Sequence, residues 1–226
     1  MNAVDFFENG LVYFCHGARN ELLEYSQFHA ETEDAWKQKN FSLQDKIDKI
    51  LQKHPEEDHQ EIIEHHVWEL HQNQFKFPAI HRSATVIAIY VFLEEQLNTL
   101  CRVVSKSMST QIKLKDIRGQ GIERAVTYLS KVAGFDFGRI STMQYLRIVN
   151  QLRNKIVHAG GRLSTSRDEK LNTFVSEQKG LAGDPGECVC IKANFIEEMT
   201  ENLILFFEEL DKQVQKFIQR HTNDSS

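Results

Sequence analysis

The residues best suited to chemistry in this sequence lie in one short segment. Arg153 and Asn154 are adjacent, and His158 follows Asn154 by four positions. On a helix, Asn154 and His158 are neighbours one turn apart, whereas Arg153 lies roughly 140° around the axis from His158. A long arginine side chain can still bend toward the same cleft. Histidine can act as a general acid or base near neutral pH, and arginine can stabilise a developing negative charge.

The segment that carries these residues has the pattern of an amphipathic helix over about residues 141–158. Its apolar stripe contains Tyr145, Ile148, Val149, Leu152 and Ile156. Two consecutive glycines follow at 160 and 161, and glycine is the usual residue just beyond a helix end. We therefore expect the helix to stop there and leave His158 near solvent.

Apolar periodicity predicts further helices on both sides of this segment. They cover about residues 9–37, 42–54, 55–74, 78–107, 122–132 and 194–220. Between 162 and 193 the helical pattern fails, and residues 173–175 and 188–191 flank a stretch rich in Gly, Pro and Asp that is typical of a short hairpin. The sequence thus predicts an all-α, up-and-down helical bundle with a small β-hairpin before the last helix. We expect an N-terminal helical extension over 1–75, a helical domain over 76–220 and a frayed polar tail over 221–226.

Composition limits the class of protein. A length of 226 residues with 41% hydrophobic residues is enough for a core of ordinary size. No apolar run reaches the roughly 20 residues of a membrane span, and the start lacks a secretory signal. The four cysteines are scattered without the spacing of a disulfide framework. We therefore expect a reduced, cytoplasmic protein without a membrane partner.

The charge is unevenly distributed along the chain. Residues 102–170 contain 14 Lys and Arg against 5 Asp and Glu, whereas the rest contains 13 against 27. Such asymmetry indicates a surface in the middle third that faces an anionic partner, although folding can also scatter these charges.

The stretch from Arg153 to His158, Arg-Asn-Lys-Ile-Val-His, resembles the R-x4-6-H motif of the HEPN superfamily, in which a polar residue often follows the arginine. The stretch over 81–98 is similar to the long central helix of that family, with an acidic position at Glu94 or Glu95. Residues 114–129 look like its connection and third helix, and 195–217 like its last helix. The resemblance covers about residues 78–220.

The resemblance implies a metal-independent endoribonuclease in many members, often a toxin or antiviral effector, with a site built across a homodimer. It implies that Arg153, Asn154 and His158 are the catalytic residues, supported by Glu94 or Glu95, and that no cofactor or metal is needed. A dimer also follows from the chemistry, because attack by the RNA 2′-hydroxyl needs both a base and an acid and the segment offers one histidine. Many relatives have a tyrosine two residues after the histidine, where this chain has Gly160. The subgroup of toxins defined by that tyrosine is therefore not indicated, and an antitoxin or a regulatory protein stays a candidate partner beside RNA.

Other interpretations stay open. Arg153 and His158 can be solvated residues on a helix face, and other HEPN members are non-catalytic modules that bind RNA, a nucleotide or a partner protein. An unrelated helical scaffold is a third interpretation. The six histidines from His54 to His81 have no metal-ligand spacing and are typical of a surface helix rich in His and Glu. Cys188 and Cys190 lack a second ligand pair, so we expect ordinary strand residues.

Overall fold

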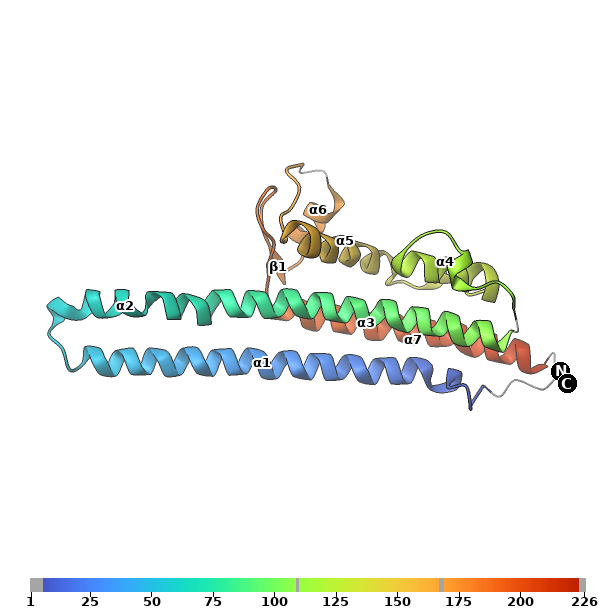
Figure 1. Ribbon diagram of the computed structural model, residues 1–226, viewed down its shortest axis with the longest axis horizontal. Coiled ribbons are helices and arrows are strands. Elements are labelled where there is room, and N and C mark those ends of the chain that lie inside the picture. Colours follow the sequence, from blue (N-terminus) through green and yellow to red (C-terminus); the bar gives the residue numbers. More distant parts are fainter. Residues whose placement is uncertain (1–5, 109, 167–168, 224–226) are drawn as a thin grey trace. The chain divides into compact units, whose positions relative to one another are not determined.

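The computed structural model describes residues 6–108, 110–166 and 169–223. The described helices are α1 (Phe14–Leu51), α2 (His59–His71), α3 (Phe77–Ser107), α4 (Gly121–Ala133), α5 (Met143–Ala159), α6 (Lys170–Glu177) and α7 (Ala193–Asn223). Strands β1 (Leu181–Ala182) and β2 (Cys190–Ile191) pair antiparallel, with Leu181 opposite Ile191. The prediction of an all-α protein with a small β-hairpin is confirmed (Figure 1). Among the described helices, none combines the length and apolar character of a membrane span.

The chain forms two compact units, and each takes segments from both sides of residue 75. Unit 1 comprises Met1–Glu24, Ile87–Gly161 and Glu198–Ser226, and unit 2 comprises Tyr25–Val86 and Arg162–Glu197. Helices α1, α3 and α7 each contribute residues to both units. The predicted division into an extension over 1–75 and a domain over 76–220 follows the sequence order and does not coincide with these two units. It stays a prediction.

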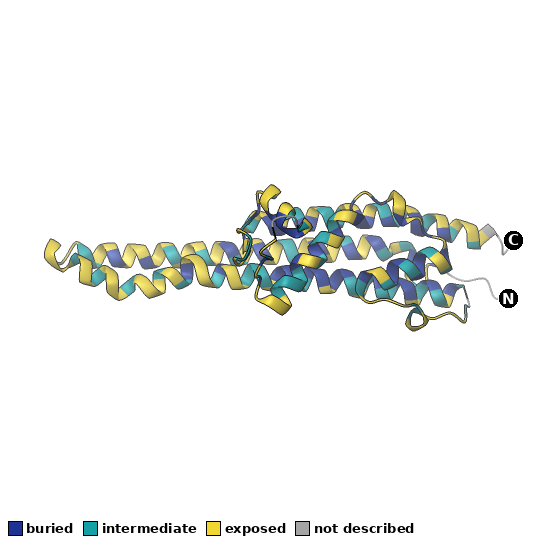
Figure 2. Cartoon of the chain, turned by 90° about the horizontal axis from the view of Figure 1, so that it is seen from above, coloured by how far each residue is buried: buried dark blue, intermediate teal, exposed yellow. Residues whose placement is uncertain are grey.

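Unit 1 is a helical bundle with an aromatic core. Helices α4 and α5 lie beside the second half of α3 (Figure 1), and Phe92 of α3 packs against Phe207 of α7 with ring centroids 6.4 Å apart. Buried residues form stripes along the helices (Figure 2), as expected for amphipathic elements. The core of unit 1 includes the fully buried rings of Tyr90, Tyr128, Phe206, Phe207 and Phe217.

Unit 2 contains most of α1, and here the predicted break between residues 37 and 42 is wrong. Helix α1 runs unbroken to Leu51, because Leu43 and Ile47 are buried and continue its packed face. No glycine or proline interrupts this stretch, so the weak start signal of Ser42 does not outweigh continued helical hydrogen bonding. The turn into α2 is closed by His59, whose Nε2 donates to the carbonyl oxygens of Leu51 and His54 at 2.9 and 3.0 Å.

The predicted helix boundary at Pro78 is also wrong. Helix α2 passes into α3 through a π-helical turn, η3 (Gln72–Lys76), and Pro78 is the second residue of α3. A proline inside a helix lacks an N–H and clashes with the carbonyl four residues before it. A π turn just ahead of the proline shifts the hydrogen bonds to a longer spacing, and the helix continues instead of ending.

The hairpin forms, but from a different first strand. Residues 173–175 lie in α6, where Leu171 and Val175 are buried one turn apart, so the first strand predicted there is wrong. Cys190 lies in β2, and Cys188 forms an isolated backbone β-bridge with Arg162. Both cysteines are free thiols and exposed.

At the C-terminus, α7 extends through Asn223, so 221–223 belong to the helix rather than to a tail. Residues 224–226 lie outside the described residues.

Substitution of Gly180 tests how closely its backbone packs against Phe195 in unit 2. A Cβ added there would lie 2.8 Å from the backbone Cα and N of Phe195, which is closer than side chains approach. We expect Gly180→Ala to lower the free energy of unfolding by about 1–3 kcal/mol. Gly17→Ala is the matched control, since Gly17 lies inside α1 with nothing within 4 Å of its added Cβ. That change should raise the free energy of unfolding by about 0.5–1 kcal/mol. Urea denaturation measures both, and equal effects would contradict the packing described.

Candidate functional site

The end of helix α5 is set by Gly160. Its φ of 58° and ψ of 28° lie in the left-handed region that glycine adopts without strain. The N–H groups of Gly160 and Gly161 both donate to the carbonyl oxygen of Lys155, which closes the helix. The predicted glycine stop is confirmed, and it comes two residues after His158.

Arg153 lies on the packed side of α5, against α3. Its Cζ is 5.9 Å from the ring centroid of Tyr90, and its Nη1 donates to Oδ1 of Asn154 at 2.9 Å. The Nε of Arg153 is buried and has no hydrogen-bond partner among the described residues. The guanidinium is therefore held by a ring and an amide, and its buried Nε–H donor is unused.

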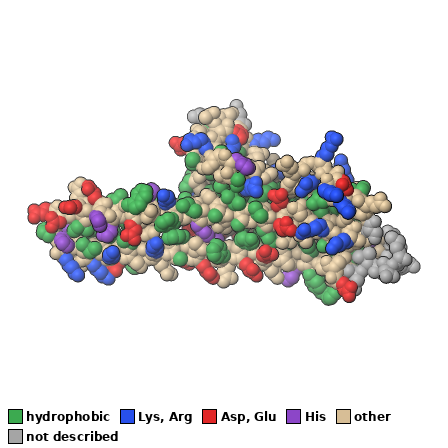
Figure 3. Space-filling view, in the orientation of Figure 1, with side chains coloured by type: hydrophobic (Ala, Val, Ile, Leu, Met, Phe, Trp, Pro, Cys, Tyr) green, Lys and Arg blue, Asp and Glu red, His purple; other side chains and the backbone are tan. Residues whose placement is uncertain are grey.

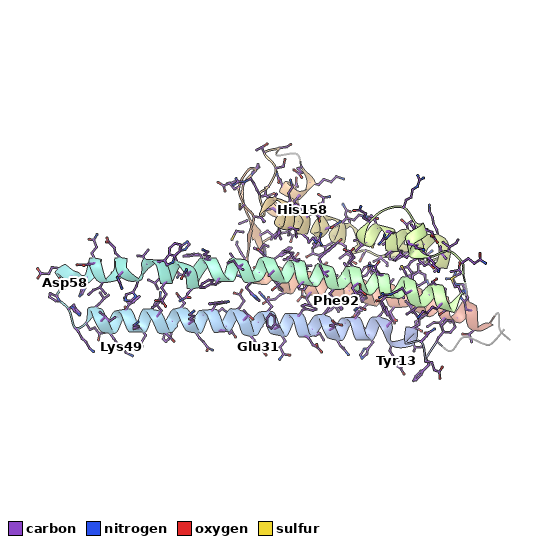
Figure 4. All side chains as sticks on the ribbon, in the orientation of Figure 1. Tyr13, Glu31, Lys49, Asp58, Phe92 and His158 are labelled. Carbon is purple, nitrogen blue, oxygen red and sulfur yellow. The ribbon has the colours of Figure 1, made fainter. Side chains whose placement is uncertain are left out.

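His158 is exposed at the last turn of α5 (Figure 4). Asn154, one turn earlier on the same helix, is half-buried, and its Oδ1 accepts a hydrogen bond from Arg153. A single chain thus brings Arg153 and Asn154 together and presents the imidazole of His158 to solvent. This matches the wide angle between Arg153 and His158 expected from helix geometry.

The two acidic candidates on α3 have different surroundings. Glu95 is exposed, and its Oε1 accepts a hydrogen bond from Nη2 of Arg102 at 2.7 Å. Glu94 is half-buried, and its charge acts on the hydroxyl of Tyr90, as does that of Arg153. Glu94 is therefore the acidic residue that shares surroundings with Arg153. Its supporting role stays a prediction.

Tyr90 links these charges inside unit 1. The side chain is 1% exposed, and its hydroxyl has no hydrogen-bond partner among the described residues. Burial, followed by the charge of Glu94, raises the pKa of the Tyr90 hydroxyl well above its usual range, while Arg153 opposes the rise. Tyr90 is thus a neutral side chain whose hydroxyl feels the charges of both Glu94 and Arg153.

A basic cavity of about 550 Å³ opens along α3 within unit 1. Figure 3 shows Lys and Arg side chains gathered over the end of α3 and α4. The side chains that line the cavity include five cations, namely Arg102, Lys106, Lys113, Lys115 and Arg124. Of these, Arg102 pairs with Glu95, and among the described residues the other four have no ion pair. Part of the predicted basic surface is therefore concentrated in one place that suits an anion.

A second polar group lies buried in unit 2, and two of its members are not among the residues that the sequence singled out. His29 and Glu33 of α1 are 1% and 6% exposed, and Nδ1 of His29 is 3.0 Å from Nε2 of His81 on α3. Both oxygens of Glu33 accept hydrogen bonds from Arg82, at 2.7 and 2.6 Å. The spacing of His29 and Glu33, four residues apart, was the available signal, but the partner histidine is 52 residues away in the sequence.

Among the residues that the structure describes, His29, Glu33 and His81 form the group whose side chains could hold a metal ion, with ligand atoms within 4.8 Å of one another. The other histidines of the predicted His-rich surface helix differ from His81. His54, His65 and His66 line a shallow surface pocket with Asp58, Glu61 and Glu64.

Comparison of the chain with protein-family models, curated proteins and solved structures finds no match.

The buried hydroxyl of Tyr90 gives a test of the surroundings of Arg153. Tyr90→Phe keeps the ring beside Arg153 and removes an unpaired polar group, so we expect the free energy of unfolding to rise by about 1 kcal/mol. Tyr128→Phe is the matched control, because the hydroxyl of Tyr128 donates to the carbonyl oxygen of Ile112 at 3.2 Å. That variant should lose about 0.5–1.5 kcal/mol. Denaturant unfolding of both variants checks the opposite signs, and a loss in Tyr90→Phe would show that its hydroxyl has a partner.

The histidine pair of unit 2 predicts a pH dependence of stability. Burial is the main cause that lowers the pKa of both His29 and His81, and the charge of Arg82 adds to it. Glu33 opposes the change for both histidines, and the Ala193 carbonyl and Glu197 also oppose it for His29. Below about pH 6.5 the unfolded chain then binds more protons than the folded chain, so stability falls as the pH falls.

We expect this loss between about pH 7 and pH 5, and a shallower slope in the double variant His29→Gln/His81→Gln. Glu33 does not titrate within this pH window. Burial raises the pKa of its carboxyl group, but the hydrogen bonds and charge of Arg82 lower it more, so the net pKa is below its usual value. Urea unfolding at several pH values measures the slope. His65→Gln, on the exposed surface of α2, should keep the wild-type slope, and an unchanged slope in the double variant would contradict the assignment.

Proposed function

We propose that this chain is a metal-independent endoribonuclease of HEPN type that acts as a homodimer in the cytoplasm, as a toxin or antiphage effector. The observation that supports this most is the exposed imidazole of His158, one turn beyond an Arg153–Asn154 pair on the same helix. These are the three residues that the family motif assigns to cleavage, and they carry the chemistry that cleavage needs.

In the proposed reaction, the 2′-hydroxyl of a ribose attacks the adjacent phosphorus and the 5′-oxygen leaves. One imidazole accepts the proton of the 2′-hydroxyl, and another donates a proton to the leaving oxygen. The products are a 2′,3′-cyclic phosphate and a free 5′-hydroxyl. Because each chain offers one His158, two copies related by a two-fold axis would supply base and acid together.

Arg153 and Asn154 have separate roles in this proposal. The guanidinium of Arg153 would stabilise the negative charge that grows on the phosphorane oxygens. The Oδ1 of Asn154 accepts a hydrogen bond from Arg153, so the amide nitrogen of Asn154 would orient the phosphate or His158. Arg153 is half-buried in the single chain, and its buried Nε has no partner among the described residues, so the Arg153 side chain would have to shift for this donor to reach a phosphate.

The basic cavity supports an RNA substrate. Four cations around one cavity repel one another and are stabilised when a polyanion replaces their small counterions. The cavity lies along α3, the helix on which Arg153 packs through Tyr90. An RNA chain that reaches both regions would gain affinity from its phosphates and undergo cleavage at the motif.

The test is cleavage of a labelled RNA by the purified chain in excess EDTA. We expect wild type to leave 2′,3′-cyclic phosphate ends, and His158→Ala to cut about 10²–10⁴-fold more slowly. The control is His16→Ala, which removes an exposed helical histidine of unit 1 whose described contact is the neighbouring Asn20. It should cut like wild type. Equal cutting by wild type and His158→Ala would rule out the assigned role of His158.

Mixed dimers test the shared site. A dimer of one wild-type and one His158→Ala chain should cut far more slowly than half the wild-type rate, because the one site that the two chains share would lack one imidazole. Half the wild-type rate would instead mean that each chain cuts independently.

A second candidate function is a non-catalytic module that binds RNA, a nucleotide or a partner protein. The packing of Arg153 against Tyr90 and the cavity lined by unpaired cations favour it. If wild type cuts no RNA, filter binding of the same RNA decides. Lys106→Gln/Lys115→Gln should then weaken binding and flatten its salt dependence, whereas His158→Ala should not.

A further inference from the structure

The convergence of two histidines and a carboxylate inside unit 2 has a use that the proposed ribonuclease does not require. We propose that His29, Glu33 and His81 bind a zinc ion that joins α1 to the first turns of α3. The site involves none of the residues proposed for RNA cleavage, so the two proposals stand separately. It departs from the expectation of a metal-free chain drawn from the sequence.

The hydrogen bonding of His29 leaves a lone pair for a metal. Nε2 of His29 lies 3.2 Å from the carbonyl oxygen of Ala193, and a carbonyl can only accept, so Nε2 carries the proton. Nδ1 of His29 is then unprotonated and faces Nε2 of His81 at 3.0 Å. Metal-binding histidines commonly donate their second ring N–H to a backbone carbonyl in this way, which fixes the ring and its tautomer.

The spacing of the ligand atoms is close to that of a zinc site. Tetrahedral bonds of about 2.0–2.1 Å place ligand atoms roughly 3.3 Å apart. The two imidazole nitrogens are 3.0 Å apart, a little less than this separation, and the Glu33 carboxylate lies within 4.8 Å of them. His29 and Glu33 are one turn apart on α1, so a small change of the Glu33 side chain completes the set. The proton now shared by the two rings would move to Nδ1 of His81.

The electrostatic surroundings suit a divalent cation of the zinc type. Arg82 holds Glu33 by both oxygens, and each oxygen keeps a second lone pair for the metal. A second carboxylate, Glu197, also acts on His29, so His29 feels two negative charges and the positive charge of Arg82. Imidazole nitrogens select zinc over magnesium or calcium, which prefer oxygen ligands. Three protein ligands leave a fourth position for water or an added group.

The test is titration of the full chain, stripped with EDTA and dialysed, with Zn²⁺ by calorimetry. We expect one zinc ion per chain, a rise in melting temperature on addition of zinc, and no comparable binding of Mg²⁺. His81→Gln should weaken zinc binding by about tenfold or more. His81 is half-exposed, so this variant disturbs the core less than a change at His29. Circular dichroism confirms that it folds.

The matched control is the double variant His65→Gln/His66→Gln, which removes two histidines of the surface pocket near the start of α2. It should bind zinc like wild type. Three outcomes would overturn the proposal: no stoichiometric zinc binding by wild type, unchanged binding in His81→Gln, or loss of binding in the surface variant alone. In the last case the zinc is bound adventitiously on the surface. RNA cleavage assays do not enter this test.

Discussion

Burial of the apolar face of α5 is the constraint on which the candidate site depends. Leu146, Val149 and Leu152 are nearly inaccessible to solvent within unit 1, and burial of each such side chain contributes roughly 1.5–3 kcal/mol. Rotation of α5 about its axis would expose them, so its orientation is fixed. That orientation presses Arg153 against the ring of Tyr90 and turns His158 to solvent. The core therefore determines which polar residues of the helix can meet a substrate directly and which lie partly enclosed.

The elements were predictable where a pattern is local. The periodicity of α5 and the glycines after it predicted the helix and its end, because both depend on neighbouring residues. The boundaries between consecutive helices were less predictable. Ser42 and Pro78 carry local signals for boundaries, yet packing of Leu43 and a π turn before Pro78 keep the helices continuous. The prediction of the first hairpin strand at 173–175 is wrong for a related reason. Leu171 and Val175 are buried at helical spacing, and this burial holds 173–175 in α6.

The difference between local patterns and long-range packing also explains why the residues of the α5 motif were predictable and the buried His29–Glu33–His81 group was not. Arg153, Asn154 and His158 lie within six residues, so helix geometry alone predicted their angular arrangement. His29 and Glu33 of α1 contact His81 and Arg82 of α3 only when the two helices pack. The sequence pattern of either segment alone does not predict this contact. The density of histidines in the sequence is highest around α2, and it therefore indicates a surface helix rather than the buried contact. The buried pair instead combines one histidine from that His-rich stretch with one from outside it.

The π turn between α2 and α3 also sets the angular phase of the helix that follows. A π turn holds one more residue than the α-helical turn it replaces, and one residue corresponds to about 100° of rotation. The side chains of α2 and of the first part of α3 are thus offset by this angle relative to an unbroken α-helix. Loss of a single residue from Gln72–Lys76 would leave the chain helical but turn His81 and Arg82 away from α1. The length of this turn, rather than its composition, therefore sets which side chains of the first part of α3 face α1.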